Sequence, residues 1–221
     1  AMVGKLAAGM AHSIRNPLTS VKMRLFSLSR NLELTAEQQE DFDVISDEIR
    51  HTDTIVQNFL EFSRPPKLKI QVISPSEIVD FAVQLMEHRI ESYGVRADIR
   101  RDSVMPPVEA DPEQIKEVLV NIIVNACEAM QGGGRILISE ETGIDEKLGK
   151  VVFIHIEDNG PGISPKNSSR VLQPFFTTKE EGTGLGLSIA TRIVEEHGGA
   201  LTFRSREFDG TVFTITLPVK E

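Results

Sequence analysis

Apolar residues at spacings of three and four recur through the first 62 residues and predict two helices. The first stripe runs from Leu6 to Leu32 and the second from Phe42 to Phe59. Thr35 is followed three residues later by Gln38, the spacing of a capping box that begins the second helix. Two long helices with a short connection predict an antiparallel hairpin. Such a hairpin has little core of its own, so we expect it to pair with a second copy into a four-helix bundle.

The pattern changes at Arg64-Pro65-Pro66-Lys67, which predicts a linker. Beyond the linker, segments with a helical spacing of apolar residues are interspersed with segments in which apolar and polar residues alternate as in a strand. The chain as a whole is therefore expected to be α+β. The expected domains are residues 1–64 and 65–221. No regular pattern is found between 158 and 184, and so long a loop in a compact domain predicts a lid or ligand loop. We expect helices at 75–93, 111–130 and 185–197, and strands at 68–73, 95–99, 135–140, 151–156, 201–205 and 211–217.

Composition and charge exclude several classes of function. The chain has 221 residues, with 24 Lys+Arg against 33 Asp+Glu and a net charge of −9. This balance disfavours sequence-independent binding of nucleic acid, which needs a basic surface. One cysteine excludes a disulfide framework and a cysteine-based zinc cluster. Because no run of about 18 apolar residues occurs, we expect a soluble, cytoplasmic module of a longer protein, whose membrane anchoring is left open.

Charge is unevenly distributed along the chain. Residues 1–32 contain five basic residues and no acidic one, whereas residues 33–61 contain nine acidic residues and one basic residue. The first helix therefore offers a basic surface that the average composition hides.

Two groups of polar residues lie on predicted helices. His12 and Asn16 are four apart, share one helix face and lie off the apolar stripe, so His12 is a candidate phosphoryl acceptor or an ordinary surface histidine. Asn121 and Asn125 are also four apart, on a helix that is otherwise apolar. Their amides serve either cross-helix hydrogen bonds or a Mg²⁺ site that water and phosphate complete.

Two glycine-rich segments follow in the second domain. Asp158-Asn159-Gly160-Pro161-Gly162 comes directly after a strand, where the carboxylate can accept from an exocyclic amine; the alternative is an ordinary Asn-Gly turn. Gly182-Thr183-Gly184-Leu185-Gly186-Leu187 runs into a helix and can present backbone N–H groups to an anion, or else act as a flexible hinge. Pro174 to Lys179 adds an aromatic anchor and a cation to the same loop.

In order and spacing, these motifs together resemble the catalytic core of a two-component sensor histidine kinase. The amino-acid sequences of Arg15–Leu18 and Asn125–Met130 most resemble those of the nitrogen-regulation-type branch. The resemblance implies a dimerisation and histidine-phosphotransfer hairpin, followed by an ATP-binding α/β sandwich of the gyrase and Hsp90 type. The sandwich would be a mixed sheet covered on one face by helices. It also implies ATP or ADP and Mg²⁺ as cofactors, and a homodimer that transfers phosphoryl groups to an aspartate of a response-regulator receiver.

The resemblance also implies a role for each motif. His12 would accept the phosphoryl group, Asn16 would act in phosphatase chemistry, and the acidic receiver would meet the basic first helix. Asp158 would bind the adenine amino group, while Asn125, with Asn121, would hold Mg²⁺ at the phosphates. The remaining positions expected to bind nucleotide are Gly160, Gly162, Phe176, next to the matching Phe175, then Thr178, Lys179, Gly182, Thr183, Gly184, Leu185, Gly186, Leu187 and Thr211.

Ser13 departs from the family's pattern, which has Glu or Asp directly after the histidine. Serine is a poor proton acceptor, and general-base help is worth about 10²–10⁴ in rate, so autophosphorylation is expected to be weakened. Two readings therefore stay open: an active histidine kinase, and a kinase-impaired, nucleotide-gated binding and phosphatase module. A purely structural coiled-coil adaptor would leave the glycine and asparagine motifs unexplained.

Overall fold

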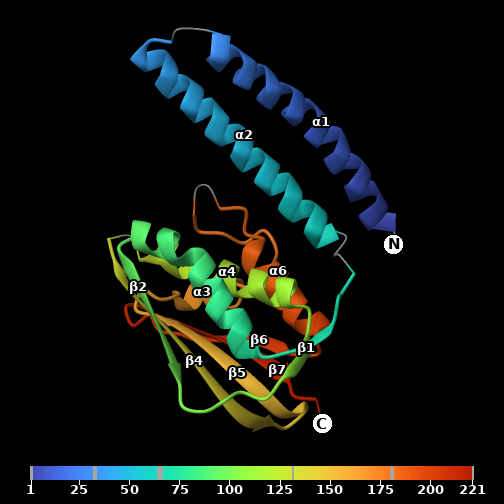
Figure 1. Ribbon diagram of the computed structural model, residues 1–221, viewed down its shortest axis with the longest axis vertical. Coiled ribbons are helices and arrows are strands. Elements are labelled where there is room, and N and C mark those ends of the chain that lie inside the picture. The colour runs from blue at the N-terminus through green and yellow to red at the C-terminus, as the bar shows by residue number, and fades with distance from the viewer. Residues whose placement is uncertain (1, 32–33, 64–66, 131, 180–181, 221) are drawn as a thin grey trace. The chain divides into compact units, whose positions relative to one another are not determined.

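A computed structural model describes residues 2–31, 34–63, 67–130, 132–179 and 182–220 (Figure 1). The chain forms two compact units, Ala1–Lys67 and Leu68–Glu221, called here the hairpin unit and the sheet unit. The expected linker falls largely outside the described residues, because 64–66 are not among them. No described helix combines the length and the apolar character needed to cross a membrane.

The hairpin unit consists of the two expected antiparallel helices, α1 (Met2–Asn31) and α2 (Ala36–Ser63). The capping box at the start of α2 is confirmed. The backbone N–H of Gln38 donates to Oγ1 of Thr35 at 3.3 Å, and the backbone N–H of Thr35 donates to Oε1 of Gln38 at 3.0 Å. Each side chain thus satisfies a backbone group that the helix leaves unpaired.

Among the hairpin side chains that the structure describes, few are buried. Val56 is buried, whereas Leu18 and Leu25 on α1 are only half-buried. The guanidinium of Arg15 joins the helices through an ion pair with Asp53 at 3.6 Å and a hydrogen bond to the side chain of Gln57. A second apolar row, called here the α1 seam, remains exposed at seven-residue intervals: Ile14, Val21 and Leu28.

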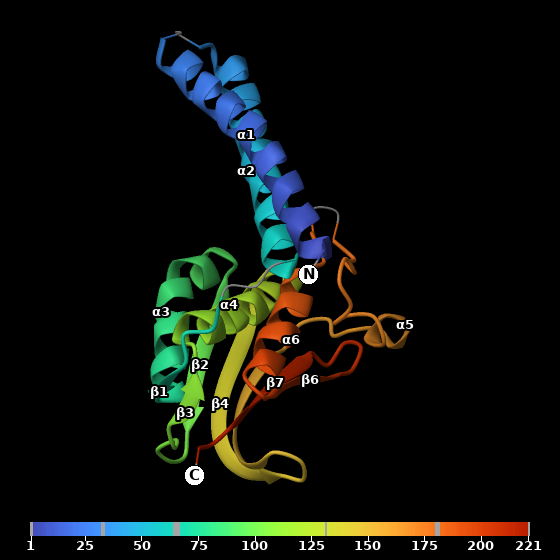
Figure 2. The same ribbon diagram turned by 90° about the vertical axis from the view of Figure 1, so that its right-hand side faces the viewer.

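The sheet unit is a mixed five-stranded sheet in the order β2-β4-β5-β7-β6, with three helices packed on one face (Figure 2). Only β2 and β4 run parallel; the other neighbours are antiparallel. This confirms the expected α/β sandwich. The strands are β2 (Val95–Arg101), β4 (Gly134–Asp145), β5 (Gly149–Asp158), β6 (Ala200–Ser205) and β7 (Thr211–Pro218), and the helices are α3 (Pro75–Ser92), α4 (Pro112–Ala129) and α6 (Gly186–Glu196).

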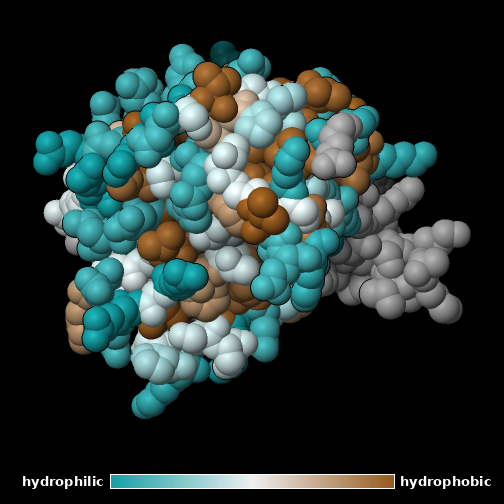
Figure 3. All heavy atoms as spheres, turned by 90° about the horizontal axis from the view of Figure 1, so that it is seen from below, coloured by the Kyte–Doolittle hydropathy of each residue, from teal (hydrophilic) through white to brown (hydrophobic). Residues whose placement is uncertain are grey.

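The core of the sheet unit lies between the sheet and these helices. Isoleucines that alternate along the strands point into it, and they meet apolar residues of α4 and α6. The fully buried large side chains include Ile136, Ile138, Ile154, Ile156 and Ile215 from the sheet and Leu119, Ile122, Ile123 and Ile189 from the helices. On the face that Figure 3 shows, hydrophobic side chains are scattered among hydrophilic ones.

The structure differs from the sequence expectation at several strands and in the long loop. The strand expected at 68–73 is only β1 (Gln71–Ile73), which pairs with an unexpected short strand, β3 (Val108–Ala110). Strands β4 and β5 extend beyond their apolar parts, because their polar ends pair with each other as far as Asp145 and Gly149. The irregular stretch from 158 to 184 contains a single helical turn, α5 (Pro165–Ser168).

A buried imidazole joins the start of α4 to the end of α6. The backbone N–H of Asp111 donates to Nε2 of His197 at 2.9 Å, and Nδ1 of His197 lies 2.7 Å from the carbonyl oxygen of Ile193. Because a backbone amide can only donate, the ring proton is on Nδ1. The Asp111 carboxylate also caps α4 by accepting from the N–H groups of Glu113 and Gln114.

Candidate functional site

The second half of α4 carries three polar residues on one face. Asn121, Asn125 and Glu128 follow each other at spacings of four and three, so their side chains leave the helix in nearly the same direction. All three are half-buried, whereas Ile122, Ile123 and Ala126 between them are buried in the core. The helix thus presents two amides and one carboxylate at the edge of the apolar core.

Asp158 ends the central strand β5 and is buried. Burial raises the pKa of its carboxyl group, although hydrogen bonds from the backbone N–H groups of Gly160 (2.9 Å) and Thr211 oppose this shift. The neighbouring turn needs glycine at 210, because φ is +80° and a Cβ there would lie 1.9 Å from the carbonyl oxygen of Asp158. The result is a fixed, buried hydrogen-bond acceptor.

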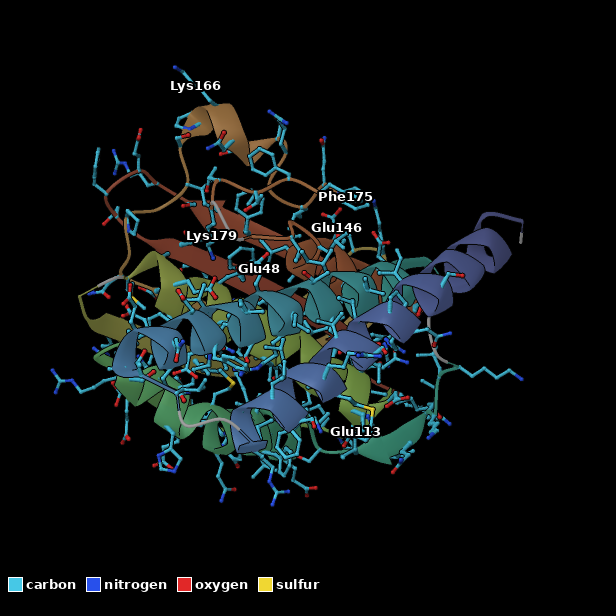
Figure 4. The ribbon with its side chains drawn as sticks, turned by 90° about the horizontal axis from the view of Figure 1, so that it is seen from above. Glu48, Glu113, Glu146, Lys166, Phe175 and Lys179 are labelled. Carbon is cyan, nitrogen blue, oxygen red and sulfur yellow. The ribbon has the colours of Figure 1, made fainter. Side chains whose placement is uncertain are left out.

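The loop between α5 and α6 carries two phenylalanines and a lysine that reaches α4. The guanidinium carbon of Arg170 lies 4.6 Å from the ring centroid of the half-buried Phe176, while Phe175 is exposed and has a positive φ of 63°. The ammonium of Lys179 donates to Oδ1 of Asn125 at 3.1 Å and to Oε2 of Glu128 at 2.5 Å. Figure 4 shows the contrast with Lys166, whose side chain points away from the sheet unit.

The second glycine-rich segment leads directly into α6. Gly184 has φ of +65°, and a Cβ there would come within 2.7 Å of the backbone of Phe175 and Phe176, so the segment packs tightly on the aromatic loop. Leu185 is buried just before the helix, and its N–H donates to Oγ1 of Thr183 at 3.3 Å. At Gly186 a Cβ would lie 3.4 Å from Oδ1 of Asn121. The N-terminus of α6 therefore lies beside the polar face of α4.

Three later parts of the chain, all distant from α4 in the sequence, thus meet on its second half. The loop after Asp158 packs on its end, since a Cβ on Gly160 would lie 3.1 Å from Met130 and 3.7 Å from Ala129. Lys179 reaches Asn125, and Gly186 lies beside Asn121. A helix N-terminus and a cation thus lie at the polar face of α4, and the loop after a buried acceptor lies at the end of the same helix, an arrangement suited to a base and a chain of phosphates.

The donor set fits a divalent cation bound together with phosphates. Among the described residues, no three His, Cys, Asp or Glu side chains come together to form a metal site by themselves. Mg²⁺ usually takes one or two protein oxygens and fills its other positions with water and phosphate. Oδ1 of Asn125 and Oε2 of Glu128 already converge on a positive charge, the ammonium of Lys179.

The other candidate residues take different positions. Gly162, Gly182 and Leu187 are half-buried, Thr178 is exposed, and Thr211 is buried opposite Asp158 on β7. In the hairpin unit, His12, Ser13 and Asn16 lie within α1; Ser13 and Asn16 are exposed, and the side chain of His12 lies outside the described residues.

Glu128, which pairs with Lys179, is a residue of the site that the sequence did not single out. The residue stands inside the asparagine motif, three positions after Asn125, and it is the one acidic side chain in the second half of α4. That spacing places it on the same helix face as Asn125 and could have indicated it. Its partner Lys179 is 51 residues away, however, and no local pattern links the two.

Two family models match the chain. Residues 110–221 match the model described as histidine kinase-, DNA gyrase B-, and HSP90-like ATPase. Residues 2–67 match the His Kinase A (phospho-acceptor) domain.

Curated relatives match almost the whole chain. Sensor histidine kinase ZraS of Salmonella typhi is 34% identical over 218 residues, which cover 98% of this chain and 46% of that protein. Sporulation kinase E of Bacillus subtilis is 35% identical over 220 residues, covering 100% of this chain and 29% of that protein. The chain therefore spans less than half the length of these relatives.

Solved structures share the fold. Full-length ShkA in complex with AMPPNP superposes with a TM-score of 0.82 at 26% identity, covering 98% of this chain and 46% of that one. The histidine kinase ThkA in complex with the response regulator protein TrrA gives a TM-score of 0.70 at 30% identity, covering 99% of this chain and 62% of that one.

Proposed function

The chain belongs to the two-component sensor histidine kinases, of which it is the catalytic core, and from that premise we propose that it transfers the γ-phosphoryl group of ATP to its own His12. The observation that carries this proposal is the convergence of the loop after Asp158, Lys179 and the start of α6 on the second half of α4. The phosphoryl group then passes to an aspartate of a response-regulator receiver. Membership of the nitrogen-regulation-type branch stays a prediction from the sequence motifs.

Asp158 is proposed to recognise the adenine ring. Its ionised carboxylate accepts from the exocyclic amine, while the N–H of Gly160 fixes the carboxylate orientation. A buried acceptor is selective, because a ring without a donor at this position leaves the carboxylate unpaired. The AMPPNP complex of the structural relative ShkA supports a nucleotide at this fold.

The polar face of α4 is proposed to hold the phosphates through a metal ion. Asn125, with Asn121 as a second ligand, would hold Mg²⁺, which neutralises charge on the phosphate oxygens when bound. Lys179 and the backbone N–H groups at the start of α6 contact the phosphates directly. The wall of the site is completed by Gly160, Gly162, Phe176, Thr178, Gly182, Thr183, Gly184, Leu185, Gly186, Leu187 and Thr211.

His12 is proposed to attack the γ-phosphorus in line through a neutral ring nitrogen. The bond from the γ-phosphorus to the bridging oxygen breaks, ADP leaves, and the ring then loses its proton. Ser13 cannot take up this proton at ordinary pKa, so the step proceeds without the usual carboxylate. Positioning and charge neutralisation therefore provide most of the catalysis.

Two copies of the hairpin unit are proposed to form a four-helix bundle through the α1 seam. The seven-residue spacing of Ile14, Val21 and Leu28 is typical of a helix-packing seam, and these side chains are 42–49% exposed within one chain. The match of residues 2–67 to the His Kinase A domain supports this assembly.

A second candidate function, a nucleotide-gated phosphatase for the regulator, is favoured by Ser13. In this reading Asn16, exposed one turn after His12, orients a water molecule against the receiver's phosphoaspartate. The basic surface of α1, which has no acidic residue among positions 1–32, suits the acidic pocket of a receiver. The complex of the relative ThkA with TrrA supports a partner of this class.

Incubation with γ-labelled ATP and Mg²⁺ separates the two functions. A kinase gives acid-labile label that is absent in His12→Ala, and Ser13→Glu should increase the labelling rate by about 10²–10⁴. If the chain takes up no label but an added phosphorylated receiver loses its phosphate faster, the phosphatase is the correct function. If Ser13→Glu labels no faster than the original chain, the role given to position 13 is wrong.

A further inference from the structure

Glu128 lies between two cations that come from different parts of the sheet unit. Its Oε2 accepts from Nζ of Lys179 at 2.5 Å, and its Oε1 lies 3.6 Å from Nη2 of Arg89 on α3. The carboxylate is 29% exposed, whereas Lys179 is 38% exposed and Arg89 is 51% exposed. Helix α4 therefore carries an anion with one partner on a neighbouring helix and one on the loop before α6.

The Lys179 ammonium also occupies the oxygen proposed to bind the metal. It donates to Oδ1 of Asn125 at 3.1 Å while it is paired with Glu128. A divalent cation on the same oxygen would lie a few ångströms from the ammonium, and two such charges repel strongly in a partly buried site. Lys179 and Mg²⁺ therefore cannot share Asn125.

We propose that Glu128 is a positioning residue that keeps Lys179 on Asn125 until metal-bound nucleotide takes its place. This inference rests on the proposed nucleotide function. In the presence of metal-bound nucleotide, Lys179 would exchange the Glu128 carboxylate for phosphate oxygens, so that one anionic partner replaces another. Glu128 keeps Arg89 after the exchange, so its buried part is not left without a counter-charge.

The exchange predicts that removal of the Glu128 carboxylate and removal of Arg89 change nucleotide affinity in opposite directions. Without the carboxylate, Lys179 no longer has to leave an ion pair, so nucleotide binds more tightly. Without Arg89, release of Lys179 leaves Glu128 unpaired, so nucleotide binds more weakly. A partly exposed ion pair changes affinity about two- to fivefold, which sets the size of both effects.

Calorimetric titration of the whole chain with ADP and Mg²⁺ tests this exchange. Glu128→Gln should bind about two- to fivefold more tightly than the original chain, and Arg89→Met about two- to fivefold more weakly. Glu113→Gln, at the opposite end of α4 and paired with Lys116, is the control for removal of one acidic charge and should bind like the original chain (Figure 4). Lys166→Met, in α5 and with a side chain that points away from the sheet unit, is the control for removal of a lysine and should also bind like the original chain.

A Lys179→Met background distinguishes this exchange from simple attraction or repulsion of the phosphates. If Glu128 and Arg89 act through Lys179, both substitutions lose their effect in that background. If either keeps its full effect there, or if Glu128→Gln weakens binding as loss of a metal ligand would, the positioning role is wrong. If Asp158→Asn abolishes binding but Glu128→Gln and Arg89→Met change nothing, only this inference fails. If the original chain binds no nucleotide, the proposed function fails with it.

Discussion

The two units of the chain differ in how far they bury their apolar residues. The sheet unit buries rows of isoleucine between a five-stranded sheet and three helices, and residues such as Ile154 and Ile215 are fully inaccessible. In the hairpin unit, Val56 is buried among the described side chains, while apolar residues of both helices stay exposed, among them Val21 and Ile45. Both units use similar residue types, but only the sheet unit has a second layer to cover them.

This difference indicates where each unit obtains its stability. Two helices bury one strip between them, and the opposite strip needs a further helix pair. A sheet with helices on one face closes its core within one chain. We therefore expect the sheet unit to unfold independently of protein concentration, whereas the hairpin unit should depend on association with a second copy.

Truncation of the sheet core should have the largest effect. Ile154→Ala leaves a cavity in the central strand β5 and should lower the free energy of unfolding of the sheet unit by about 2–5 kcal/mol. Ile144→Ala, at an 82% exposed position of β4, should change it by less than about 0.5 kcal/mol. Denaturant titrations at two protein concentrations measure both. A loss for Ile154→Ala that depended on concentration would contradict an independent core.

A charge in the α1 seam should have the next largest effect, and only on association. Val21 is 45% exposed within one chain, so each copy of the variant loses only about 0.7 kcal/mol of apolar burial on association. Val21→Glu also places two like-charged carboxylates in an apolar seam, so the dissociation constant should rise about a hundredfold or more. Met23→Glu, off the seam and 69% exposed, is the control. Analytical ultracentrifugation measures the dissociation constant of the dimer for both variants. Equal weakening by the two substitutions would place the dimer contact elsewhere.

Asp158→Asn should separate binding from stability within the sheet unit. The amide keeps an acceptor for Gly160 but presents N–H groups to the adenine amine, so affinity for ADP should fall by about 1.5–3 kcal/mol, tenfold or more. The thermal midpoint should not fall, because burial raises the pKa of the Asp158 carboxyl group and its ionised form opposes folding. Calorimetry and thermal unfolding measure the two properties. Unchanged affinity would remove Asp158 from the adenine site.

The sign of the pH dependence follows from the same shift. With a raised pKa, the folded unit binds this proton more tightly than the unfolded chain does. The stability contributed by Asp158 is therefore fully present when the pH is below the ordinary pKa of an aspartate. It is lost as the pH rises through the raised pKa of Asp158 in the folded unit. The Asp158→Asn variant should lack this loss. The difference between its thermal midpoint and that of the original chain should therefore increase from about pH 4 upwards. A parallel pair of pH profiles would contradict this account.

Local chemistry made much of the fold predictable. Thr35 and Gln38 predicted the start of α2, because a capping box depends on two residues three positions apart. The helix expected at 111–130 was also found, and Asp111 caps it. Strand β3 was missed because its three residues have meaning only through their pairing with β1. The sequence motifs did name Asn125 and Lys179, which the structure brings into contact. The pair of Lys179 with Glu128 was not predicted, because contact across 51 residues is set by the tertiary fold.

The buried His197 has a consequence for how the nucleotide end of the sheet unit fluctuates. Its ring clamps the first residues of α4 to the last turn of α6, whereas Asn121 and Gly186 meet nearer the other end of this helix pair. Two rods clamped at one end separate most at the opposite end. Small angular motions about the clamp would therefore vary the width of the phosphate region while the sheet stays unchanged. Hydrogen exchange should accordingly be faster at the start of α6 than beside His197.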